Sequence, residues 1–157
     1  MSGAGHQRQD SNDPEGNQLS GILIGCPSDE SKKNILATIE ADPGSAIARY
    51  ASVLRDPTFN VFYNAPSLVI IAGPEARALM AVDCALAAGY FMMAAAARGL
   101  GTCWINLGAY IEDAGMRAEL GLKEGTKVFA PIIVGYPKHI PSAPARKPPQ
   151  ILAVIGR

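Results

Sequence analysis

The chain has 157 residues, a length typical of one domain with a single hydrophobic core. Hydrophobic residues make up 48% of it, and charged residues, at 18%, fall below the usual share of about one quarter. Fourteen basic side chains balance fourteen acidic ones, so no excess positive charge can attract a nucleic acid or an anionic membrane surface. We therefore expect a globular protein that binds neither nucleic acid nor membrane.

The cysteine and histidine contents bear on compartment and on metal chemistry. The three cysteines are Cys26, Cys84 and Cys103. Their odd number and the lack of a Cys-x-x-Cys pair are typical of reduced thiols in a cytoplasmic protein. With only two histidines, neither a metal centre nor a histidine-activated nucleophile is expected.

The N-terminal end is polar and aperiodic. Residues 1–20 therefore predict a disordered tail, and residues 21–157 are expected to form the single folded domain. The tail holds no apolar stretch after a basic start, so no secretory signal is predicted.

The first predicted elements are one strand and two helices. The apolar run 21–25 predicts a strand, and Ser28 or Asp29 can cap the helix that follows it. Ser45 is expected to cap a second amphipathic helix, Ala46–Arg55, which Asp56-Pro57 ends.

A nearly continuous apolar run follows at Ser67–Ala72. Such a run is typical of a strand buried on both faces, so we expect it in the middle of a sheet. The next segment, Ala76–Arg98, has no proline and predicts a long helix that ends at Gly99. It is apolar enough to resemble a membrane span, but Asp83 within it and its many alanines argue against that alternative.

A helix that is apolar on all sides must be covered by protein on all sides. Ala81, Ala85 and Gly89 form a stripe of small residues along it, which allows another backbone to approach closely. One short chain offers too little material for this cover. We therefore expect a long buried helix and an obligate homodimer.

The remaining elements complete the predicted domain. A strand over 102–106, a weak helix over 111–120 that ends at Gly121, and an apolar strand over 127–135 are expected. The proline-rich segment 136–149 is predicted to be extended and exposed. Strands mixed with helices indicate an α+β or three-layer α/β domain.

No nucleotide loop, catalytic triad or acid–base pair can be recognised in this sequence. An enzymatic activity would therefore depend on a bound cofactor.

Five blocks, in order, resemble the flavin-dependent nitroreductase family. They are Phe62-Tyr63-Asn64-Ala65-Pro66, Val82-Asp83-Cys84 with Met92-Met93, Gly99-Leu100-Gly101-Thr102-Cys103-Trp104-Ile105, Ile133-Val134-Gly135-Tyr136-Pro137, and Arg146-Lys147-Pro148. Together they span more than half of the chain.

The resemblance implies an α+β, nitroreductase-like three-layer α/β/α domain with a central mixed sheet. It also implies a homodimer that binds FMN between its subunits. NAD(P)H would reduce the flavin, and an electron-poor small molecule would then take the electrons. Residue by residue, Trp104, Ile105 and Asn106 match the segment whose backbone lies against the flavin ring. Arg146 and Lys147 match the contact with the FMN phosphate, a role that suits an arginine fork.

The N-terminal region departs from the family pattern. An Arg-Arg-Ser motif that holds the phosphate in the family is missing, and Arg8 is the only basic residue before Lys32 apart from the chain terminus. Asn17 and Gln18 are all that matches a further cofactor-binding motif. A second interpretation is therefore a degenerate relative that no longer binds flavin and serves as a binding or structural dimer module.

Simpler interpretations exist for several of these residues. Trp104 could be only a packing residue, and Arg146 and Lys147 only solvated charges. Cys84 and Cys103 are expected to be buried small hydrophobes rather than reactive thiols, because no Lys or His adjoins them in the sequence to lower the thiol pKa.

Overall fold

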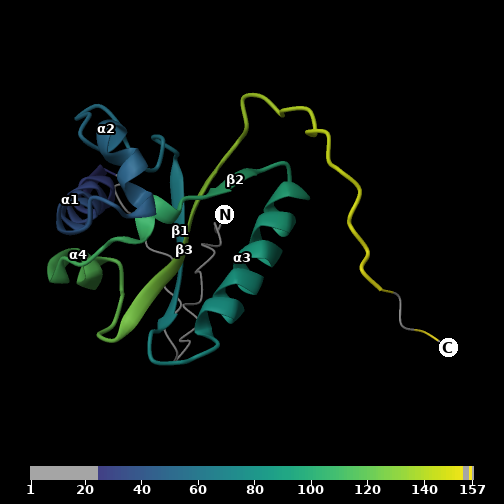
Figure 1. Ribbon diagram of the computed structural model, residues 1–157. Coiled ribbons are helices and arrows are strands. Elements are labelled where there is room, and N and C mark those ends of the chain that lie inside the picture. Colours follow the sequence, from purple (N-terminus) through teal and green to yellow (C-terminus); the bar gives the residue numbers. More distant parts are fainter. Residues whose placement is uncertain (1–24, 154–155, 157) are drawn as a thin grey trace, which may run out of the picture.

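A three-stranded sheet lies between helices in the computed structural model, which describes residues 25–153 and 156 (Figure 1). In chain order the elements are α1 (Gly25–Ala41), the 3-10 helix η1 (Ala46–Tyr50), α2 (Ala51–Leu54), β1 (Ser67–Pro74), α3 (Met80–Ala96), β2 (Gly101–Trp104), the 3-10 helix η2 (Asn106–Ala109), α4 (Ala114–Glu119) and β3 (Thr126–Gly135). The fold is α+β, as predicted.

The strand order is β1-β3-β2, and both pairings are antiparallel. The sheet formed by the described residues is thus not mixed, and β1 is an edge strand rather than a central one. The apolar run of β1 is explained instead by the helices that pack on both faces of the sheet. Of the strand predicted at 21–25, residues 21–24 lie outside the described residues, and Gly25 begins α1.

Two hydrophobic clusters lie on the two faces of the sheet. On one face, Ile35, Leu54 and Phe62 form a cluster against which Ile133 of β3 packs. On the other face, Ala88 of α3 packs against Ile132 of β3. Because side chains alternate along a strand, these neighbouring isoleucines point to opposite faces. The expected three layers are therefore present.

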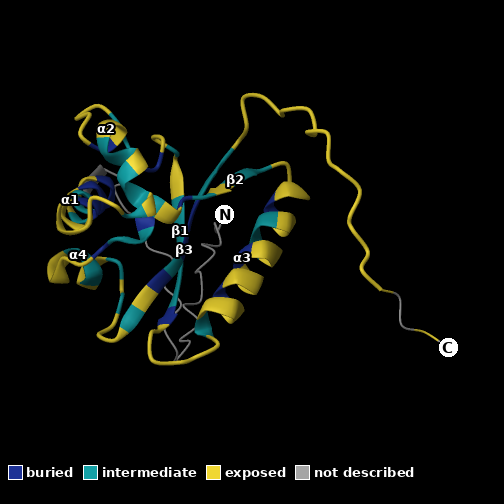
Figure 2. Cartoon of the chain, in the orientation of Figure 1, coloured by how far each residue is buried: buried dark blue, intermediate teal, exposed yellow. Residues whose placement is uncertain are grey.

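The long helix is shorter and more exposed than predicted. Its last turn is capped by Gly99, whose φ is +74°, and Leu100 donates its N–H to the Ala95 carbonyl at 3.0 Å. Only the side facing the sheet is buried, and Tyr90 and Met93 are 75% and 71% exposed (Figure 2). Within the single chain the helix is thus covered on one side only, and the predicted cover of its other side by a second subunit stays a prediction. No helix in the described part of the chain has the length and apolarity that crossing a bilayer requires.

The predicted helix caps are replaced by other contacts. α1 begins before Ser28, whose buried hydroxyl instead accepts the Val61 N–H at 2.9 Å. Ser45 donates its hydroxyl to the Asp42 carbonyl at 2.7 Å and does not cap η1. The helix predicted over 46–55 is therefore divided into η1 and α2.

A buried lysine joins α1 to the chain that follows α2. Lys32 is 8% exposed, and its Nζ donates to the carbonyl oxygens of Asp56 at 2.8 Å and Phe59 at 2.9 Å. These carbonyl dipoles compensate the buried ammonium charge. They also fix the segment that leads into the Phe62-Tyr63 turn.

The C-terminal segment lacks regular structure, as its prolines predict. Residues 136–153 are exposed and run away from the sheet and helices (Figure 1, Figure 2).

Candidate functional site

The site begins where β2 leaves the sheet. Trp104 pairs with Ile132, but the next residue of the central strand is Pro131, which has no N–H to donate. Ile105 donates its own N–H to the Pro131 carbonyl at 2.8 Å, and the chain then turns into η2. A proline in the central strand thus sets the position of the Trp104–Asn106 segment.

A cavity of about 520 Å³ opens beside this segment, and we call it the Trp104 pocket. Its size lies in the range of small-molecule sites, which are commonly about 300–1,000 Å³. The pocket is rich in aromatic rings contributed by segments that are distant in sequence. Its lining includes Arg49 and Tyr50 of η1, Tyr63, Cys103 and Trp104 of β2, Ile105, Asn106 and Tyr110.

The wall at Tyr63 has an unusual backbone. Tyr63 and Asn64 both have a φ of +53°, a left-handed conformation that is uncommon outside glycine. The turn is held by hydrogen bonds from the Tyr63 N–H to the Asn60 carbonyl and from the Ala65 N–H to the Phe62 carbonyl. The Tyr63 ring also packs edge-on against Phe59, with centroids 5.8 Å apart. This turn presents Tyr63 to the pocket.

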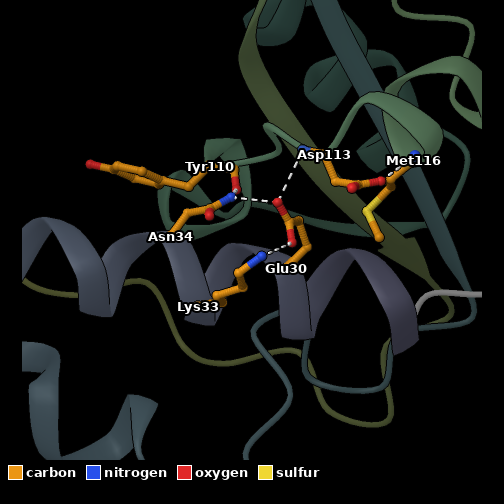
Figure 3. A network of polar contacts seen from close by, with 6 residues as sticks. All are labelled: Glu30, Lys33, Asn34, Tyr110, Asp113 and Met116. Carbon is orange, nitrogen blue, oxygen red and sulfur yellow. Dashed lines mark hydrogen bonds and ion pairs between the residues drawn. The ribbon is translucent and has the colours of Figure 1, made fainter.

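The wall at Tyr110 is held by a polar network that starts on α1 (Figure 3). Asn34 donates its Nδ2 to the Tyr110 carbonyl at 2.9 Å and to Glu30 Oε1 at 2.7 Å. Glu30 Oε1 also accepts the Asp113 N–H at 3.0 Å, and Asp113 caps α4 by accepting the Met116 N–H. The network therefore fixes the loop between η2 and α4.

The three residues predicted near a flavin ring lie together here, with different environments. Ile105 is buried in the core and its N–H is already bonded, so it contributes shape rather than a donor. Trp104 packs beside Ala88 and Ile132, and its indole Nε1 is buried without a hydrogen-bond partner among the described residues. Asn106 is exposed at the start of η2. Trp104 is thus a packing residue that also lines the pocket, and its contact with a flavin ring stays a prediction.

Cys84 and Cys103 differ in their burial. Cys84 is buried, as predicted, and its pKa is raised by that burial and, to a smaller extent, by the nearby charge of Asp83. Burial therefore keeps Cys84 a neutral thiol. Cys103 is exposed and lines the pocket, so its predicted burial is wrong. It lies on an edge strand of the described sheet, where one side has no strand to cover it.

The other predicted contacts lie elsewhere. Arg146 and Lys147 belong to the exposed C-terminal segment and do not line the pocket of their own chain. Asn17 and Gln18 lie outside the described residues. The roles of all four residues stay predictions.

A larger cavity of about 690 Å³ shares Asn106 and Tyr110 with the Trp104 pocket. Its lining carries charges of both signs, including Lys127 and Glu75, whose Nζ and Oε1 are 3.1 Å apart. Arg117 in its wall donates to the Ile111 carbonyl at 3.0 Å, a contact within the fold. We regard the Trp104 pocket as the candidate site because its lining is aromatic and contains the whole Trp104–Asn106 segment. Nowhere in residues 25–153 do three or more His, Cys, Asp or Glu side chains gather as metal ligands would.

Solved structures share this fold. A nitroreductase with bound FMN from Bacteroides fragilis has a TM-score of 0.65 and 22% identity over 85% of this chain and 73% of its own. An FMN-dependent nitroreductase from Clostridium difficile has a TM-score of 0.56 and 19% identity over 80% of this chain and 73% of its own. An FMN-bound nitroreductase from Desulfitobacterium hafniense has a TM-score of 0.51 and 21% identity over 80% of this chain and 65% of its own. The fold is therefore nitroreductase-like.

The family follows from the sequence itself. The model of the nitroreductase family matches residues 22–136, which is more than half of the chain. The chain belongs to the nitroreductase family, as its five sequence blocks predict. No curated protein matches the sequence.

Proposed function

We propose that this protein is an FMN-dependent NAD(P)H oxidoreductase of nitroreductase type. Its acceptor is proposed to be an electron-poor small molecule and its location the cytoplasm. The observation that carries the proposal is the Trp104 pocket, in which the segment assigned to the flavin ring lines an aromatic cavity. FMN-bound relatives of the same fold support it.

The residues of the pocket fit FMN. Tyr50, Tyr63 and Trp104 line the pocket and offer aromatic surface to a flat ring. Asn106 supplies an amide that can donate and accept. When bound, FMN supplies the two-electron chemistry, and the chain's residues orient it and exclude water from one side. Arg146 and Lys147 stay candidates for a phosphate contact across the proposed dimer, because they do not line the pocket of their own chain.

The test is reconstitution of the purified full-length protein with FMN. We expect a yellow protein whose flavin absorbance is bleached by NADH or NADPH under anaerobic conditions and restored by a nitroaromatic compound. Protein that retains FMN but is not bleached by either nucleotide would contradict the oxidoreductase assignment.

We also propose a homodimer formed through the exposed face of α3. Val82, Leu86, Tyr90 and Met93 recur along that face and leave a contiguous apolar surface on the single chain. Such a surface is typical of a subunit interface.

Gly89 gives a specific test of this dimer. Space around it is open within one chain, so Gly89→Leu should not destabilise the monomer and should stabilise α3 by up to about 1 kcal/mol, since glycine is a poor helix former. Across a close helix contact, the same side chain should weaken association by about 1–3 kcal/mol. Sedimentation should then show a lower dimer fraction for Gly89→Leu than for the wild type and for Gly89→Ala. A wild-type protein that is monomeric at low micromolar concentration would contradict the proposal.

A second candidate function follows from the missing basic motif. The degenerate-module interpretation predicts a stable dimer that has no measurable affinity for FMN. Calorimetry with FMN separates it from the oxidoreductase.

A further inference from the structure

The charge in the Trp104 pocket comes from one residue. Of the described residues that line it, Arg49 is the only charged one, and the others are apolar, aromatic or neutral polar side chains. No carboxylate opposes it there. The pocket therefore favours a ligand with an aromatic part and a negative charge.

The Arg49 guanidinium is held in place by a neighbouring ring, and its N–H donors are not used within the described residues. Its central carbon lies 4.9 Å from the centroid of the Tyr50 ring, an arrangement that orients the guanidinium by a cation–π interaction. Across the part of the chain that the structure describes, no carboxylate or carbonyl oxygen accepts a hydrogen bond from it. An arginine with free donors can bind a phosphate through two parallel N–H···O bonds.

We propose that Arg49 binds the phosphate of FMN in this protein, an inference that rests on the proposed function. Two observations favour the phosphate over the flavin ring. Arg49 is exposed, as suits contact with a hydrated dianion rather than with a buried ring edge. The sequence also lacks the N-terminal Arg-Arg-Ser motif, and the basic pair Arg146-Lys147 does not line the pocket of its own chain. Among the described residues that line the pocket, Arg49 is thus the one cation.

The test compares FMN with riboflavin, which differ only in the phosphate. Trp104 is the only tryptophan of the chain and lines the pocket, so quenching of its fluorescence reports binding of either flavin to the full-length apoprotein. The wild type should bind FMN more tightly than riboflavin. Arg49→Met should weaken FMN binding about tenfold or more, since it removes charge-assisted hydrogen bonds, and should leave riboflavin binding within about twofold. Arg49→Lys should restore part of the loss.

The control variant is Arg55→Met. Arg55 is an exposed arginine just after α2 that does not line the pocket, so this change should leave both affinities unchanged. Circular dichroism should show that Arg49→Met and Arg55→Met are folded to the same extent.

Two results would overturn the inference. Equal weakening of FMN and riboflavin by Arg49→Met would place the arginine at the ring, and no weakening of FMN would place the phosphate elsewhere. If Arg49→Met does not weaken FMN binding, an Arg146→Met/Lys147→Met variant should be tested. Loss of its preference for FMN over riboflavin would show that this basic pair binds the phosphate instead. Failure of the wild type to bind either flavin contradicts the proposed function itself and is therefore distinguishable from both results.

Discussion

Replacing Gly108 by valine is expected to destabilise the protein by about 3 kcal/mol, because the core has no room for the added side chain. Gly108 is buried in η2, and a Cβ atom there would meet the ring of Phe62 well inside van der Waals contact. Phe62 is fully buried and cannot move aside without opening the core. Because η2 begins at Asn106, the last residue of the Trp104–Asn106 segment, this variant should also lose the pocket. Chemical denaturation followed by Trp104 fluorescence measures the change.

Gly44→Ala is the matched control for that experiment. Gly44 is exposed, and a Cβ atom there would make only an ordinary contact with Asp42. The free energy of unfolding of the Gly44→Ala variant should stay within about 0.5 kcal/mol of the wild-type value. Similar stabilities for Gly44→Ala and Gly108→Val would show that η2 does not pack on Phe62 as described.

The second large effect is expected at Lys32. Lys32→Met should lower the free energy of unfolding by about 2–4 kcal/mol, because two charge-assisted hydrogen bonds are lost and the carbonyls of Asp56 and Phe59 lose their donor. Those carbonyls precede the turn that presents Tyr63 to the pocket.

Its neighbour Lys33 supplies the comparison. The side chain of Lys33 is 76% exposed and its Nζ lies 3.8 Å from Glu30 Oε2, so Lys33→Met should cost no more than about 1 kcal/mol. Urea denaturation of both variants measures the difference. An equal, small loss for Lys32→Met and Lys33→Met would mean that the ammonium of Lys32 is solvated rather than buried.

Local features of the fold could be predicted from the sequence because they depend on neighbouring residues. Gly99 and Gly121 end their helices with a positive φ, as their positions predict. The apolar runs at β1 and β3 form strands. The position of β1 could not be predicted, since an apolar run reports that both faces are covered and not how many strands lie beside it.

The residues of the candidate site also divide into those that the sequence predicts and those that it does not. Trp104 and Ile105 could be found because they lie within one block of the family resemblance, and Asn106 because it follows that block directly. Arg49 was missed because no motif contains it and only the folded chain brings it to the pocket. Tyr63 stands in the first block of the family resemblance, but the block alone does not indicate that its side chain lines the pocket. The exposed face of α3 is a third case, because its apolar composition is evident in the sequence while its cover by a second subunit stays a proposal.

Calorimetric titration of the full-length apoprotein with FMN tests the central claim most directly. Binding in an aromatic pocket with a cation predicts a dissociation constant in the micromolar range or tighter, with one FMN per chain. That binding should be lost when Gly108→Val introduces bulk against Phe62 in η2. Absence of binding heat at any accessible FMN concentration, from a protein that is folded and dimeric, would contradict the account and leave the family scaffold without its cofactor.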